Sequence, residues 1–193
     1  MFQPAAFTGR ADSDNFNPDE HRITIPDVVK EIEKNKHVKP GDFNPVPCSH
    51  YSCFAVSYYL IIDDDWYLSL KEFLGMVNYV NMITNKAYPG LDEEGFKIIR
   101  ERIDELWYEE DLDNVNERIL KRIREIFLKI NISSFSLEKV FNLGVESMKN
   151  IFIHQFQDVH TLDFDRLVTC CNHYAMGDGR IVPMCAQNVF FQK

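Results

Sequence analysis

The five cysteines of this 193-residue chain are the side chains best suited to chemistry, and they fall into two clusters. Cys48 and Cys53 lie in a Pro-Cys-Ser-His-Tyr-Ser-Cys segment, whereas Cys170, Cys171 and Cys185 lie near the other end of the sequence. Thiolates bind soft metals, act as nucleophiles or oxidise to disulfides. The fold must therefore bring two distant segments together before four of these thiols can share one site.

The second cluster brackets a predicted β-hairpin. Gly177-Asp178-Gly179 is a turn signal between two short strand-like runs, Tyr174–Met176 and Arg180–Met184. A turn centred on Asp178 predicts an antiparallel register in which residues equally distant from the turn lie opposite each other.

This register places Cys171 opposite Cys185, with both sulfurs on one face of the hairpin. Side chains alternate between the two faces of a strand, so Cys170 is expected on the other face, as a buried thiol outside the site. Cys171 and Cys185 could then form a disulfide or supply half of a metal site.

The cellular compartment helps to decide between these chemistries. No signal peptide opens the chain, and no apolar run approaches the roughly eighteen residues of a membrane span, so we expect a cytoplasmic protein. Thiols stay reduced there, which favours a Cys-x4-Cys pair and a Cys-x13-Cys pair acting as metal ligands over a disulfide or ordinary buried cysteines. Four thiolates suit zinc or an iron-sulfur cluster, and spacings wider than Cys-x2-Cys favour the cluster.

Two histidines stand beside the cysteines. His50 lies between Cys48 and Cys53, and His173 follows Cys171 by two residues. A histidine near a metal site more often donates a hydrogen bond to a ligand or simply packs, so both are predicted to hydrogen-bond a ligand or pack beside the site, with a mixed Cys/His ligand set as the alternative. A Cys171/His173 nucleophile pair is conceivable, but four co-located cysteines favour a metal site.

Composition limits the partners. A hydrophobic content of 45% and a charged content of 26% are typical of a globular protein. The net charge of -9 argues against nucleic acid as a main partner, because phosphate binding needs a basic surface.

The elements predicted around the cysteines give an α+β fold that is mostly helical with short β-hairpins. A helix begins after Thr24, which forms a capping box with Asp27, and ends near Lys34. An irregular loop rich in proline then leads to the first cysteine pair. A hairpin with Asp63-Asp64-Asp65 as a polar turn follows, for which a divalent-cation site is the weaker interpretation.

Three apolar patterns at helical spacing predict three further helices, over Phe96–Trp107, Val115–Ile130 and Leu137–Phe152. The second has a basic outer face, which could contact anionic lipid headgroups, although a solvated face is the ordinary interpretation. Membrane association of a cytoplasmic protein therefore stays open.

Several segments carry a more specific pattern: Phe2–Arg10, Arg22–Val28, Pro45–His50 with Cys53, Cys171–Tyr174 and Asp178–Asn188. Together they resemble the C-terminal half of radical S-adenosylmethionine proteins of the archaeal tetraether lipid synthase group. The resemblance runs essentially from end to end, and the cysteine motifs are its specific part.

The resemblance implies an auxiliary 4Fe-4S cluster held by Cys48, Cys53, Cys171 and Cys185. In such enzymes another cluster cleaves S-adenosylmethionine to a radical that abstracts hydrogen from an unactivated carbon, and lipid-coupling members join two isoprenoid chain ends. Residues 1–47 would be the last part of a (β/α) barrel with its connecting loop, and residues 48–193 a helical and hairpin domain for the auxiliary cluster.

One departure from the family limits the activity. The Cys-x3-Cys-x2-Cys triplet that binds the radical-generating cluster is absent from the sequence. The isolated chain is therefore not expected to cleave S-adenosylmethionine, and the catalytic barrel is expected upstream or on a separate chain. We expect a lipid or another apolar substrate.

Two alternatives stay open beside the resemblance. The same thiolates could bind zinc in a structural interaction module without catalysis, or the chain could be a non-catalytic remnant with a vacant site. Arg10 could contact substrate, but a structural ion pair is favoured.

Overall fold

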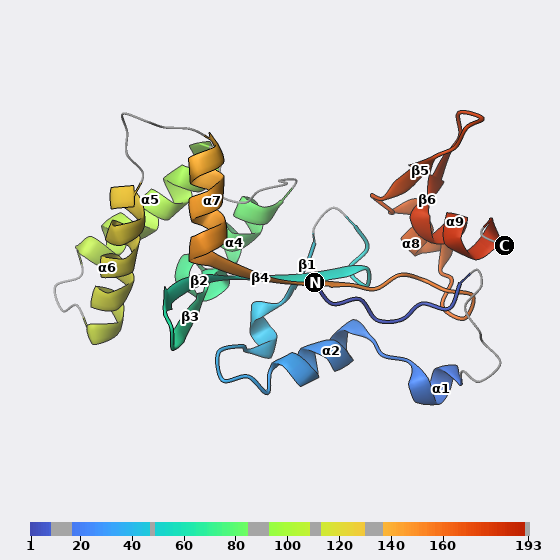
Figure 1. Ribbon diagram of the computed structural model, residues 1–193, viewed down its shortest axis with the longest axis horizontal. Helices are drawn as coiled ribbons and strands as arrows, with labels where there is room; N and C mark the ends of the chain where they lie inside the picture. Colours follow the sequence, from blue (N-terminus) through green and yellow to red (C-terminus); the bar gives the residue numbers. More distant parts are fainter. Residues whose placement is uncertain (9–16, 47–48, 85–92, 109–112, 130–136, 192–193) are drawn as a thin grey trace. The chain divides into compact units, whose positions relative to one another are not determined.

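The computed structural model describes residues 1–8, 17–46, 49–84, 93–108, 113–129 and 137–191 (Figure 1). The chain divides into two compact units, one of Met1–Val56 with Ile151–Lys193 and one of Ser57–Asn150. Helices and small antiparallel sheets occur together, which confirms the predicted α+β class. The assignment of residues 1–47 to a barrel and 48–193 to a cluster domain stays a prediction.

The first unit contains short helices and short strands. Its elements are α1 (Pro18–His21), α2 (Ile25–Ile32), the 3-10 helix η1 (Pro40–Asp42), β1 (Asn44–Pro45), α8 (Phe164–Val168), β5 (His173–Ala175), β6 (Ile181–Pro183) and α9 (Met184–Phe190). The strands β2 (Phe54–Asp63) and β4 (Met148–His154) cross the boundary between the units.

The start of α2 follows its sequence signal. The Asp27 carboxylate accepts hydrogen bonds from the backbone N–H of Thr24, at 2.9 Å, and from its hydroxyl, at 2.6 Å. Pro26 occupies the first turn, where its missing N–H costs nothing. The predicted helix start is confirmed, and the helix ends at Ile32, two residues before the predicted end.

Strand pairing brings the beginning and the end of the first unit together. β1 pairs antiparallel with β2, and β4 also pairs with β2. Phe2 forms a parallel bridge with Ile153, whose side chain is fully buried. Two backbone hydrogen bonds, from Phe2 to Phe152 at 2.8 Å and from His154 to Phe2 at 3.0 Å, hold this bridge.

The C-terminal hairpin has the predicted register. β5 and β6 are antiparallel, with Tyr174 opposite Val182. Gly179 lies in the turn with φ of 85°, a conformation that residues with a Cβ rarely adopt. The turn chemistry therefore sets the pairing, as the sequence indicated.

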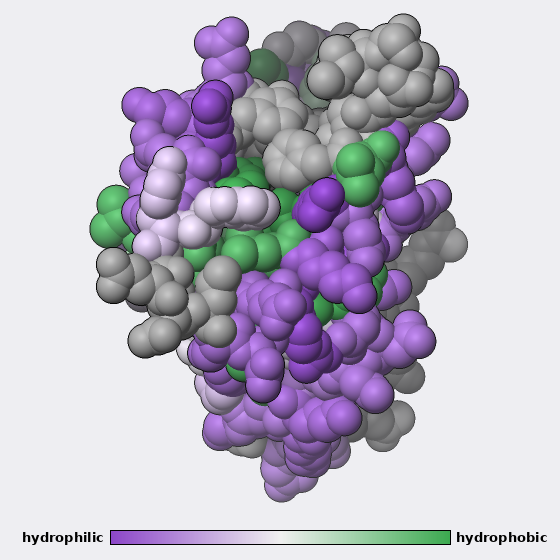
Figure 2. All heavy atoms as spheres, turned by 90° about the vertical axis from the view of Figure 1, so that its left-hand side faces the viewer, coloured by the Kyte–Doolittle hydropathy of each residue, from purple (hydrophilic) through white to green (hydrophobic). Residues whose placement is uncertain are grey.

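The second unit is helical around a hairpin. Its helices are α3 (Leu70–Leu74), α4 (Met76–Ile83), α5 (Glu93–Trp107), α6 (Asn114–Lys129) and α7 (Leu137–Ser147), and β3 (Trp66–Ser69) pairs antiparallel with β2. Tyr79, Met82 and Leu106 are its most deeply buried large side chains. The outward face over α5 and α6 is mostly hydrophilic, as expected of amphipathic helices (Figure 2).

The aspartates between β2 and β3 form a polar turn, as predicted. The Asp63 carboxylate accepts a hydrogen bond from the Asp65 N–H at 3.0 Å and forms an ion pair with Arg118. These contacts are typical of a polar turn.

One helix prediction is wrong in part. The helical pattern predicted up to Phe152 ends at Ser147, and Met148–His154 forms β4. Ile151, Phe152 and Ile153 have strong β-propensity, and pairing with β2 outweighs the helical spacing of the preceding residues. Within the described part of the chain, every helix is too short or too polar to cross a bilayer.

Candidate functional site

The segment after β4 contacts both cysteine clusters. The Gln155 N–H donates to the Cys53 carbonyl at 2.9 Å, and the Gln157 N–H donates to the Cys185 sulfur at 3.4 Å. Gln157 is almost completely buried. A stretch of three residues thus links two cysteines that are far apart in the sequence.

Arg166, on α8, carries a positive charge into this region. Its side chain is buried, and its Nη2 atom lies 3.0 Å from the Gln155 carbonyl, 3.3 Å from the Ser52 carbonyl and 3.5 Å from the Cys53 sulfur. The guanidinium thus contacts the backbone on both sides of the site as well as the Cys53 sulfur. Sequence analysis did not identify this residue.

Cys170 lies beside the chain that leads into Cys185. Its sulfur donates to the Asn172 carbonyl at 3.0 Å, and the same carbonyl accepts a hydrogen bond from the Met184 N–H at 3.0 Å. The residue is half-buried. Cys170 is thus less buried than expected, and a contact with a backbone carbonyl does not test the face of the hairpin on which its sulfur was predicted to lie.

The pKa of the Cys185 thiol is affected by two other cysteines. Burial raises the pKa of Cys185, and the nearby thiolates of Cys170 and Cys53 raise it further. The hydrogen bond from Gln157 and the charge of Arg166 act in the opposite direction on this pKa. Cys53 and Cys170 thus each lie within electrostatic range of Cys185.

The other predicted ligands are placed differently. Cys171 is exposed, and Cys48 lies outside the described residues. The prediction that Cys185 faces Cys171 across a ladder is wrong, because the ladder ends at the His173–Pro183 pair and Cys185 lies on α9. In the chain as described, no three His, Cys, Asp or Glu side chains are arranged to hold a metal ion.

The two histidines of the cysteine motifs differ in their surroundings. The Nδ1 atom of His50 accepts a hydrogen bond from the Ser52 N–H at 3.2 Å, which leaves the proton of the neutral ring on Nε2. His173 is exposed on β5. His50 is thus oriented within the Cys53 loop, whereas His173 faces solvent.

A third histidine, which sequence analysis missed, is held in an apolar stack. The His154 ring lies 4.0 Å from the Phe54 ring and 3.9 Å from the Phe156 ring. Burial, together with the charge of Arg166, lowers the pKa of His154 to about 4. The ring is therefore neutral at physiological pH.

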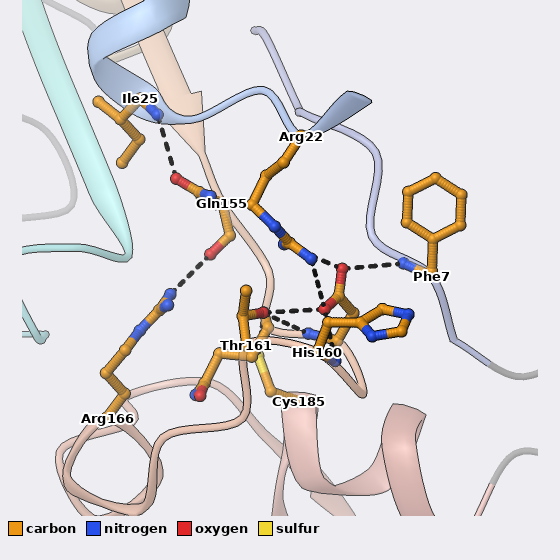
Figure 3. Close-up of polar contacts among 10 residues, drawn as sticks. Phe7, Arg22, Ile25, Gln155, His160, Thr161, Arg166 and Cys185 are labelled. Carbon is orange, nitrogen blue, oxygen red and sulfur yellow. Dashed lines mark hydrogen bonds and ion pairs between the residues drawn. The ribbon is translucent and has the colours of Figure 1, made fainter. Parts of the chain in front are cut away.

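Asp158 forms the polar centre of the first unit, and Figure 3 labels its partners Phe7, Arg22, His160 and Thr161. Its buried carboxylate forms an ion pair with Arg22 at 3.3 Å and accepts hydrogen bonds from the Phe7 N–H, the His160 N–H and the Thr161 hydroxyl. Burial alone would raise its pKa, but these donors together hold the pKa below its usual value. The carboxylate thus anchors N-terminal segments to the loop that carries Gln157.

Several buried polar atoms near the cysteines lack a hydrogen-bond partner within the described residues. They are Ser49 Oγ next to Cys48, Arg166 Nε, and Gln187 Oε1 and Asn188 Oδ1 on α9 after Cys185. Unpaired buried polar atoms are costly and call for an explanation such as a bound group or water. Their position next to cysteines of both clusters fits a site that binds a further group.

Comparison with known proteins finds a related enzyme. No family model matches the chain. It is 27% identical to the 7,8-dihydro-6-hydroxymethylpterin dimethyltransferase of Methanocaldococcus jannaschii, in an alignment that covers all of this chain and 42% of the relative. The chain thus spans less than half the length of the curated protein it matches. The match supports a relationship to radical S-adenosylmethionine enzymes and gives no support to the tetraether lipid synthase group in particular.

Proposed function

We propose that this chain is a portion of a radical S-adenosylmethionine enzyme and holds its auxiliary 4Fe-4S cluster. The main support is the grouping of Cys53, Cys170 and Cys185 with the buried Arg166. The match to a dimethyltransferase over the whole chain supports the same class of enzyme. The radical-generating cluster belongs to another part of the enzyme, because its cysteine triplet is absent from this sequence.

The proposed ligands are Cys48, Cys53, Cys185 and one cysteine of the Cys170-Cys171 pair. The resemblance implied Cys171, but the charge of Cys170 acts on the Cys185 thiol, whereas Cys171 is exposed, and this favours Cys170. We therefore assign Cys170 as the fourth ligand and Cys171 as its exposed neighbour. His50 and His173 remain outside the ligand set.

The residue types around the proposed site are those that bind an iron-sulfur cluster, although the described thiols alone do not form a three-ligand group. Thiolates from separate segments are its usual ligands, and the unpaired Arg166 Nε is a donor of the kind that hydrogen-bonds cluster sulfurs. When bound, such a cluster would relay an electron or hold an intermediate at an iron site. The chain itself would keep the site in place through the Asp158 network and through the hydrogen bond from Gln157 to Cys185.

Two substrate classes follow from different observations. The name of the relative makes a reduced pterin the first candidate substrate, with methyl transfer as the reaction. The sequence resemblance instead implied a lipid, and exposed apolar side chains near the cysteines are compatible with an apolar substrate; they include Tyr51, Val168, Phe190 and Phe191. Assays of the complete enzyme with a dihydropterin and with an isoprenoid lipid, each with S-adenosylmethionine, distinguish the two.

Metal analysis tests the proposal directly. The chain is purified without oxygen, and its iron, sulfide and zinc contents and its visible spectrum are measured. We expect about four iron and four sulfide per chain and a broad brown absorption. One zinc per chain without colour would instead indicate a structural interaction module.

A matched pair of cysteine variants tests the ligand assignment. Cys170→Ser is expected to lose most of the iron, whereas Cys171→Ser keeps it, because Cys170 acts electrostatically on Cys185 and is half-buried, while Cys171 is exposed. The reverse result would restore Cys171 as the ligand. Equal iron in both variants would remove both residues from the ligand set.

A further inference from the structure

Arg166 is an unusual residue to find buried beside thiols. Its relative exposure is 8%, and no carboxylate is among its hydrogen-bond partners as the structure describes them, which are the Ser52 and Gln155 carbonyls and the Cys53 sulfur. A buried charge without a charged partner is strongly disfavoured. The charge therefore needs an anionic partner that the protein groups around it do not supply.

The remaining donor of the same side chain points to where that partner binds. Arg166 Nε is buried and makes no hydrogen bond to any described residue, although Nη2 is satisfied. Its neighbours are thiols, which become negative when they bind a metal. The side chain thus combines a positive charge, a free donor and a position among potential ligands.

We propose that Arg166 is the counter-charge of the thiolate site, and that it stabilises the bound metal centre in its more negative state. The proposal rests on the proposed function, since it takes the thiols as ligands. A positive charge close to a metal–thiolate centre favours the reduced form and so raises its midpoint potential. Arg166 then sets a property of the centre without being one of its ligands.

The experiment compares the effect of removing the positive charge of Arg166 with the effect of removing that of an exposed arginine. The full chain and its Arg166→Gln, Arg166→Lys and Arg180→Gln variants are reconstituted without oxygen with iron and sulfide. Arg180 is the control because it is exposed on the hairpin, where it pairs with Asp178, so Arg180→Gln removes the same charge from the surface. Iron content and the midpoint potential from a spectroelectrochemical titration are measured for each.

Arg166→Gln is expected to lower the midpoint potential while the parent and Arg180→Gln agree. The expected shift is about tenfold in the ratio of reduced to oxidised centre at a fixed potential, or about 59 mV for a one-electron couple. Arg166→Lys keeps the charge, so its midpoint potential is expected to stay close to that of the parent. A fully loaded Arg166→Gln variant with the parent's midpoint potential would overturn the proposal. If Arg166→Gln fails to load, a parental midpoint potential in Arg166→Lys supports charge as the cause. A midpoint potential of Arg166→Lys that is shifted beyond that of Arg180→Gln, in either direction, overturns the proposal because the charge is kept.

A second probe separates this proposal from the proposed function. If the parent takes up no iron, the cluster assignment fails, and Co²⁺ is used alone as a probe of tetrathiolate binding. About tenfold weaker Co²⁺ binding by Arg166→Gln, with Arg180→Gln unchanged, would still support Arg166 as the counter-charge. Equal Co²⁺ affinity in all variants, or no Co²⁺ binding by the parent, would overturn it.

Discussion

The two units bury different kinds of polar side chain. Among the described residues, the buried polar side chains of the 57–150 unit are all serines: Ser57, Ser69 and Ser147. The unit that carries the cysteines instead buries charged and amide groups: Asp42, Asn44, Gln157, Asp158 and Arg166. One unit has an ordinary apolar core, and the other has a polar centre.

This difference separates a scaffold from a candidate site. Buried charges cost free energy unless they are paired, and a well-packed apolar core usually stabilises a fold at least as well. Apolar packing holds the 57–150 unit, where Tyr79, Met82 and Leu106 are nearly inaccessible. The polar centre of the other unit is therefore better explained by what it positions, namely the Gln155–Asp158 segment between the two cysteine clusters.

Removal of the Asp158 carboxylate tests this view most strongly. Asp158→Ala leaves Arg22 and several backbone donors without their acceptor, and we expect the free energy of unfolding to fall by about 4 kcal/mol. Hydrogen exchange measured by mass spectrometry should rise in residues 1–56 and 151–193 first. Chemical unfolding measures the change in the free energy of unfolding.

An exposed aspartate in the same unit serves as the control. Asp165 lies on α8 with its side chain in solvent, and Asp165→Ala is expected to change stability little. Equal losses in the two variants would mean that the Asp158 network is not the stabilising centre of the unit.

The apolar unit is expected to respond to loss of packing. Leu106→Ala removes a side chain that is 1% exposed on α5, which should cost about 3 kcal/mol through the cavity that it leaves. Iron uptake per folded chain should stay at the parental level, because the thiols lie in the other unit. Loss of iron from a folded Leu106→Ala variant would contradict the separation of scaffold and site.

Local signals in the sequence predicted local structure well. The Thr24–Asp27 cap, the Gly179 turn and the register of the C-terminal hairpin depend on residues that are close in sequence. The end of α7 was missed because strand pairing, a non-local effect, overrides the helical spacing after Ser147.

The candidate site was less accessible to sequence analysis. The cysteines were identifiable by residue type, but Arg166 contacts Cys53 across 113 positions and Arg22 contacts Asp158 across 136. A lone arginine or aspartate shows no spacing that identifies such a partner. The continuation of the hairpin as α9 after Pro183 also ends the ladder before the predicted Cys171–Cys185 pair.

A smaller effect is expected from His154, which makes the stability of its unit depend on pH. Burial first, and then the charge of Arg166, lowers the pKa of His154 from 6.5 to about 4. Between these values the unfolded chain binds a proton that the folded chain does not, so stability is expected to fall as the pH drops from 6.5 towards 4.

Imidazole chemical shifts followed by NMR provide the measurement for His154. In Arg166→Gln its pKa should rise, because one of the two causes is removed while the stacking on Phe54 is kept. His154→Phe should lose less stability over the same pH range than the parent. Titration of His154 near its ordinary pKa in the parent would show that the stack is open to water.

The smallest effect is expected for the ion pair of the apolar unit. Asp63 and Arg118 are each partly exposed, and the Arg118 guanidinium also lies 4.8 Å from the centre of the Trp66 ring. The hydrogen bond from Arg118 lowers the pKa of Asp63, but water and salt screen an exposed pair. Asp63→Asn should therefore barely change the unfolding midpoint, and the change should shrink further in high salt. Because Asp63→Asn and Asp158→Ala each remove a carboxylate paired with arginine, a loss at Asp63 as large as that at Asp158 would show that burial is not what distinguishes the two units.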